Sequence, residues 1–144
     1  MERIDYRKTG QDGFKLLGAL AAYSRNSSID YRLVELVKLR ASQINGCANC
    51  VNLHVDTLRE LGETEQRMHN MVVWREATCF TGREKAALAW TEAVTLVAET
   101  GVPDDVYELA RAEFSELELV DLTFAIVTIN AHNRLAIAFR RDPG

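Results

Sequence analysis

Residues 30–54, DYRLVELVKLRASQINGCANCVNLH, contain the pattern that decides the fold. Asp30 can accept hydrogen bonds from the free N–H groups of a first helical turn, and apolar residues then recur every three or four positions. This spacing predicts a helix over 31–44, which the Asn45-Gly46 turn ends. The side chains expected on the buried face of this helix are Leu33, Leu36, Val37 and Leu39.

The rest of the chain carries the same helical signal. It is rich in Ala, Leu and Glu, which are strong helix formers, and its two prolines, Pro103 and Pro143, both lie in the last third. We therefore expect an all-α bundle of about seven helices in a single domain over 1–144. The expected helices cover 11–25, 31–44, Cys47 to about Leu61, Glu63 to about Val73, 82–99, Pro103 to about Phe114, and the stretch from Ser115 to about Phe139.

Local signals mark the ends of several of these helices. Two capping boxes are expected, Thr81 with Glu84 and Ser115 with Glu118. In each box, the side chain of one residue accepts a hydrogen bond from the backbone N–H of the other. Gly62 and Gly101 suit the left-handed residue that follows a helix end, and Pro103 suits a first helical position. The first helix presents one apolar face, made of Phe14, Leu17, Leu20 and Ala21.

Composition narrows the possible classes of protein. Of 144 residues, 47% are hydrophobic and 26% charged, which is typical of an ordinary globular domain. The net charge of -4 argues against a partner bound through nucleic-acid phosphates. Three cysteines are too few for a disulfide scaffold, and the start, Met1 to Asp5, does not resemble a signal peptide. These features predict a cytoplasmic protein.

The last expected helix is too apolar for a helix with one side in water, because its apolar residues occupy more than one face. It would be long enough to cross a membrane, but Asp121, Asn130, His132, Asn133 and Arg134 would each be costly in lipid. We therefore expect no membrane span, and a helix that is central or buried between the subunits of a homo-oligomer.

Three residues with reactive side chains share one face at the start of the helix that begins at Cys47. Each helical residue turns about 100°, so Cys47, Cys50 and His54 fall within about 60° of arc. Free N–H groups and the positive end of the helix dipole stabilise a thiolate in this first turn. A C-x-x-C pair there suits thiol–disulfide exchange, with His54 as the base. Zinc ligation, with Cys79, His69 or His132 as a fourth ligand, and two inert buried cysteines are the alternatives.

The longer run Glu35 to Cys50, followed by His54, resembles the alkylhydroperoxidase D (AhpD)-like branch of the carboxymuconolactone decarboxylase superfamily. That branch carries a glutamate on one helix and C-x-x-C-x-x-x-H at the start of the next. The resemblance covers nearly the whole chain. It includes Trp74-Arg75-Glu76, Glu84-Lys85-Ala86-Ala87-Leu88, Asn130 and Asn133-Arg134.

The resemblance implies a function and roles for four residues. Cys47 and Cys50 would be the redox pair, His54 would polarise Cys50, and Glu35 would drive a proton relay through His54 or a water. The implied enzyme is a thiol-dependent peroxidase that acts on hydroperoxides, or a disulfide reductase. A dithiol or lipoyl-type protein would reset it, with no bound cofactor or metal, in a trimer or hexamer. From the residues alone, Glu35 could equally be a solvated helix position.

One residue departs from the family pattern. The best-known AhpD enzymes carry a histidine immediately before the second cysteine, whereas this chain has Asn49, which does not shuttle protons at neutral pH. Weaker peroxidase turnover or a different substrate would follow. The alternatives in other classes are a carboxymuconolactone decarboxylase-like enzyme acting on a small carboxylate or lactone, and a zinc-binding or scaffold module.

Some other residues are expected to be structural. Cys79 is predicted to pack, His69 to lie at the surface and Trp74 to belong to the core rather than to a substrate cleft. Cys47, nearer the helix end, is expected to be more exposed than Cys50. The polar residues of the last helix are predicted to support the site or an interface.

Overall fold

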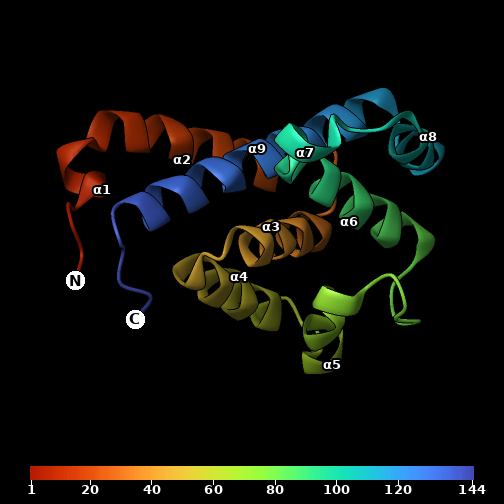
Figure 1. The fold of residues 1–144 in the computed structure, drawn as a ribbon, viewed down its shortest axis with the longest axis horizontal. Coiled ribbons are helices and arrows are strands. Elements are labelled where there is room, and N and C mark those ends of the chain that lie inside the picture. The colour runs from red at the N-terminus through yellow and green to blue at the C-terminus, as the bar shows by residue number, and fades with distance from the viewer.

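The computed structural model describes residues 1–144 and contains helices but no strand. Figure 1 shows two long helices, α2 and α9, lying side by side above α3 and α4, while α6 and α8 extend to the opposite side from the two chain ends. The elements are α1 (Tyr6–Thr9), α2 (Gln11–Arg25), α3 (Tyr31–Asn45), α4 (Ala48–Glu60), α5 (Glu65–His69), the 3-10 turn η1 (Asn70–Val73), α6 (Gly82–Thr95), α7 (Val97–Thr100), α8 (Asp104–Glu113) and α9 (Glu116–Ala138).

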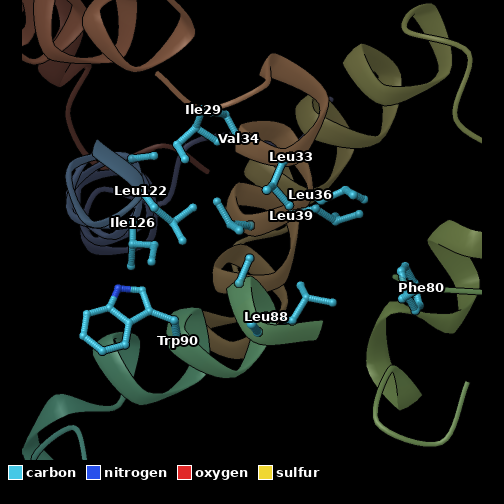
Figure 2. Close-up of a cluster of buried hydrophobic side chains, with 14 of the residues drawn as sticks. Ile29, Leu33, Val34, Leu36, Leu39, Phe80, Leu88, Trp90, Leu122 and Ile126 are labelled. Atoms are coloured by element: carbon cyan, nitrogen blue, oxygen red, sulfur yellow. The ribbon is translucent and has the colours of Figure 1, made fainter. Parts of the chain in front are cut away.

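Helix α3 lies at the centre of the molecule, packed against α4, α6 and α9. Every residue from Leu33 to Leu39 is buried, which confirms the predicted inward face and also places two charged residues, Glu35 and Lys38, inside. Figure 2 shows side chains of α3, α6 and α9 meeting in the main core. Burying each such side chain stabilises the fold by about 1.5–3 kcal/mol.

Helix α9 is central on one side and exposed on another. Its buried residues contact α2, α3 and α6, and Thr123 accepts a hydrogen bond of 2.9 Å from the Trp90 indole. An exposed apolar stripe, Leu117, Val120, Phe124 and Val127, runs along its first half. Three of these side chains line a groove of about 470 Å³ together with Trp90 and Tyr107 of α6 and α8.

The local end signals are present as predicted. Asp30 accepts from the Leu33 N–H at 3.3 Å, and both capping boxes form with both of their hydrogen bonds. Gly46, Gly62 and Gly101 have positive φ angles of 73°, 84° and 60°, which residues with a Cβ atom rarely adopt.

Several helix boundaries differ from the prediction. The helix expected over 82–99 is interrupted at Leu96 and becomes α6 and α7, and the one expected from Glu63 becomes α5 and η1. Pro103 precedes α8 instead of occupying its first position, and the short α1 was not predicted. Short helices escape detection because a single turn shows no periodicity. No helix combines the length and apolarity needed to cross a lipid bilayer.

Candidate functional site

The cysteine pair lies where α3 ends and α4 begins. Gly46 takes the left-handed conformation, and the Cys47 N–H then donates to the Ser42 carbonyl at 3.0 Å. Cys47 is the N-cap of α4 rather than its first residue, and its Sγ accepts from the Cys50 N–H at 3.3 Å. A sulfur atom at this position lies among free helical N–H groups, which stabilise a thiolate.

Side chains from α9 hold this turn in place. Asn45 Nδ2 donates to Oδ1 of both Asn130 and Asn133 at 3.0 Å, and Asn133 Nδ2 donates to Ser42 Oγ at 3.1 Å. Asn133 is fully buried. Two of the polar residues that interrupt the apolar last helix, Asn130 and Asn133, therefore connect α9 to the turn that orients Cys47.

Cys47 and Cys50 are joined by a disulfide bond, with their Cα atoms 5.3 Å apart. The expectation that Cys47 is the more exposed is wrong, because the two residues are 2% and 3% exposed. Ala41, Ile129 and Ala136 pack with them in a small cluster separate from the main core. The two cysteines border different cavities: Cys47 lines a shallow one with Ile137 and Arg140, and Cys50 lines a deeper one.

Glu35 and His54 form a buried pair beside the second cavity. Glu35 Oε2 lies 2.6 Å from His54 Nδ1, and the residues are 4% and 8% exposed. Glu35 is therefore not a solvated helix position. Because an ionised carboxylate can only accept, Nδ1 carries the proton when His54 is neutral, and Nε2 remains as the basic atom.

The cavity that contains Cys50 also contains Glu35 and His54. It has a volume of about 240 Å³ and receives side chains from α2, α3, α4 and α9. The structure therefore brings three of the four predicted site residues together in one cavity. The fourth, Cys47, is bonded to Cys50. Asn49, the residue that replaces the family histidine, lines the same cavity.

Lys38 and His132 also line this cavity. The sequence interpretation did not single out Lys38, and it considered His132 only as an alternative zinc ligand or as a support for the site or an interface. Lys38 Nζ lies 4.0 Å from Glu35 Oε1, and burial lowers the pKa of this ammonium while Glu35 opposes the shift. Burial, aided by the charges of Lys38 and His54, lowers the pKa of His132 to about 4. The sequence did contain a signal for Lys38, because a lysine three residues after Glu35 on an apolar helix is expected to lie beside that glutamate.

The remaining candidates are structural, as predicted. Trp74 is buried in the main core and donates to Glu92 at 2.8 Å, Cys79 is a free thiol packed against that core, and the His69 side chain is 79% exposed. No group of three or more His, Cys, Asp or Glu side chains is arranged to hold a metal ion.

Comparisons with known proteins agree with this geometry. The model of the carboxymuconolactone decarboxylase family matches residues 11–93, more than half of the chain. The uncharacterized protein YdfG of Bacillus subtilis (strain 168) is 39% identical over 137 residues, which cover 95% of this chain and 93% of YdfG.

Two solved structures share the fold. One, a protein of unknown function from Agrobacterium tumefaciens described as a candidate antioxidant defence protein AhpD, has a TM-score of 0.96 and 47% identity, covering 99% of this chain and 97% of that one. The other, an uncharacterized peroxidase-related protein from Silicibacter sp. TM1040, has a TM-score of 0.80 and 22% identity, covering 90% and 69%. The chain thus belongs to the carboxymuconolactone decarboxylase family, as one of its AhpD-like members.

Proposed function

We propose that this protein is a thiol-dependent peroxidase in which Cys50 attacks a hydroperoxide and Cys47 resolves the product. One observation carries the proposal: the disulfide at the start of α4 shares a cavity with the buried Glu35–His54 pair. A nucleophile, a base and a residue that orients the base are the parts that such chemistry requires. The peroxidase-related and AhpD names of the structural relatives favour the same function.

The proposed reaction begins with the reduced pair. His54 Nε2 takes the proton of Cys50, and the thiolate attacks the terminal oxygen of the hydroperoxide. The O–O bond breaks, the alcohol leaves with the proton from His54, and Cys50 becomes a sulfenic acid. The Cys47 sulfur then attacks Cys50 Sγ, the S–S bond forms, and hydroxide leaves as water with the Cys47 proton. An external dithiol or lipoyl-type protein reduces the disulfide and is itself oxidised.

Cys50 is proposed as the first nucleophile because it borders the cavity that holds the base. Cys47 borders the other cavity, beside Arg140, where an incoming thiol could attack it. A disulfide substrate in place of the hydroperoxide would follow the same route, with a thiol leaving group instead of an alcohol.

Titration with stoichiometric peroxide tests the proposal. The reduced protein should lose two free thiols and two hydrogens in mass, both confined to the peptide that contains Cys47 and Cys50. Cys50→Ser should lose peroxide turnover, and Cys47→Ser should accumulate a sulfenic acid without forming the intramolecular disulfide.

Cys79→Ser is the matched control, because Cys79 packs away from the pair and should leave turnover unchanged. Full peroxidase activity in Cys50→Ser would contradict the mechanism and favour a decarboxylase or lactone-processing enzyme. Zinc bound to the purified protein through these thiols would favour a metal-binding module instead.

We also propose that copies of the chain associate through the exposed stripe of α9. An apolar surface of this kind, continuous with an apolar groove, is typical of an interface. Sedimentation velocity should show a trimer or hexamer that Phe124→Glu dissociates. Val72→Glu, a change at an exposed valine of η1, should leave the assembly intact. A monomeric protein would contradict this part of the proposal.

A further inference from the structure

Lys38 is the buried charge that the proposed peroxidase reaction does not use. Its side chain is 8% exposed, it lines the Cys50 cavity, and its ammonium makes no hydrogen bond within the chain. Its nearest anion is Glu35 Oε1 at 4.0 Å, beyond hydrogen-bonding distance. The ammonium thus reaches the cavity without an acceptor from the chain, so this position is suited to receive an acceptor from outside the chain.

The charges around the same cavity have one predominant sign. Arg25, Lys38 and Arg141 line it, and Glu35 is the only carboxylate among the lining residues. That carboxylate already has a close partner in His54 at 2.6 Å. The cavity is thus built to attract an anion, because its cations outnumber its anions in a site of reduced solvent access.

The remaining walls limit the size and shape of the ligand. Phe14, Leu53, Ile129 and Ala136 provide apolar surface beside the cations. The volume of about 240 Å³ corresponds to about eight waters at the ~30 Å³ that each occupies in the liquid. These features fit a short alkyl chain that carries one charged group.

Glu35 and Lys38 limit the negative charge that the charged group of the ligand can carry. Phosphate carries up to two negative charges and would place both close to Glu35, which lies 4.0 Å from the Lys38 ammonium. A carboxylate carries one charge and accepts from a single ammonium in good geometry. The arrangement therefore favours a carboxylate over a phosphate.

We propose that the natural substrate is a short-chain organic hydroperoxide that carries a carboxylate, and that Lys38 binds this carboxylate while the peroxide group faces Cys50. The proposal rests on the proposed peroxidase function and adds a substrate class to it. The carboxylate takes no part in the bond changes, so Lys38 is a specificity-determining residue. Arg25 and Arg141 add attraction at the sides of the cavity.

A matched pair of probes tests the proposal: β-hydroperoxyisovalerate and its methyl ester, which share the same tertiary peroxide and differ in charge. Wild-type protein should turn over the carboxylate with a kcat/KM about tenfold or more above that of the ester, as expected for one buried charge contact. Lys38→Met keeps most of the length of the side chain and removes its charge. It should abolish this preference, because it should lower the kcat/KM for the carboxylate far more than the kcat/KM for the ester.

Binding provides a readout that does not depend on turnover. Calorimetry of oxidised wild-type protein with isovalerate should show binding that Lys38→Met loses, and Arg32→Met, a change at an exposed arginine outside the cavity, should retain it. Equal kcat/KM for the two probes in wild type, or equal losses for both in Lys38→Met, would overturn the substrate assignment. Absence of turnover with either probe, with isovalerate still bound, would overturn the peroxidase function and leave the anion site standing.

Discussion

Two carboxylates in this protein, the buried Glu35 and the partly buried Glu92, have opposite surroundings. Glu92 on α6 accepts hydrogen bonds from Arg40, Trp74 and Arg75 at 2.7–3.1 Å, so that each of its oxygens has a cationic donor. Glu35 on α3 has one close partner, the His54 ring, and faces a cavity beside a disulfide. Burial alone would raise the pKa of Glu92, but the hydrogen bonds from Trp74, Arg75 and Arg40 outweigh it and lower that pKa.

The contrast distinguishes a structural charge from a reactive one. A carboxylate surrounded by donors is held ionised and connects α3, α6 and the segment after η1. A carboxylate whose main partner is an imidazole can pass a proton along that contact. A carboxylate shielded from solvent therefore does not by itself identify the site, whereas a buried carboxylate with few donors beside a cavity does.

Glu35→Gln should have the largest effect on activity. It preserves the shape of the side chain but removes the charge that orients and supports His54, so kcat/KM for hydroperoxide should fall by about 100-fold or more. Stopped-flow measurement of thiol oxidation checks this, with urea unfolding to confirm that the variant is folded. Unchanged kinetics in a folded Glu35→Gln protein would remove Glu35 from the mechanism.

Glu92→Gln should show the reverse pattern. Loss of the charged acceptor weakens bonds from two arginines and an indole, so the free energy of unfolding should fall by roughly 2 kcal/mol. Peroxide turnover should stay at the wild-type level, because Glu92 does not line the Cys50 cavity. If Glu92→Gln impaired turnover as strongly as Glu35→Gln, the contrast between the two carboxylates would fail.

Asn133→Ala should have an intermediate effect. Ser42 and Asn45 each lose a buried partner, which should lower the free energy of unfolding by about 1–3 kcal/mol. Asn130 still holds Asn45, so the turn before Cys47 should loosen without being lost, and turnover should fall less than in Glu35→Gln. Urea unfolding and the peroxide assay measure the two effects, and Asn26→Ala, at an exposed helix end, serves as the control.

The last prediction concerns the pH dependence of stability, an effect that is absent at neutral pH. The pKa of His132 is lowered from 6.5 to about 4 in the folded protein, so between these values the unfolded chain binds a proton that the folded chain does not. The free energy of unfolding should therefore decrease as the pH falls from 6.5 toward 4. In His132→Gln the slope of the unfolding free energy against pH should decrease by an amount that corresponds to at most about one bound proton.

Urea unfolding across that pH range measures the slope. Glu92 contributes in the same direction, because a carboxylate with a lowered pKa loses its stabilising effect as the pH falls. That contribution is present in both proteins, so the difference between them isolates His132. Identical slopes would mean that His132 is not held neutral in the cavity.

Much of the fold was predictable because helices and their ends depend on neighbouring residues. The Asp30 cap, the Gly46 turn and the Ser115–Glu118 box each involve groups a few residues apart, and all three formed as expected. The interruption at Leu96 was missed. No proline or glycine marks that position.

The site was predictable to a smaller extent. The sequence by itself determined that Cys47, Cys50 and His54 share the first turns of one helix, because that arrangement follows from helical geometry and a glycine turn. Their chemical roles remain predictions. The role of Glu35 came from family resemblance, since a glutamate on an apolar helix is compatible with either burial or solvation.

Only the tertiary structure decided which groups meet. Packing of α3 against α4 brings Glu35 to His54, 19 residues away, and buries Lys38 beside them. Packing of α9 supplies Asn133 to the turn and His132 to the cavity. Helical periodicity states which face of a helix is apolar but not which other helix covers it, and that choice depends on contacts between distant residues.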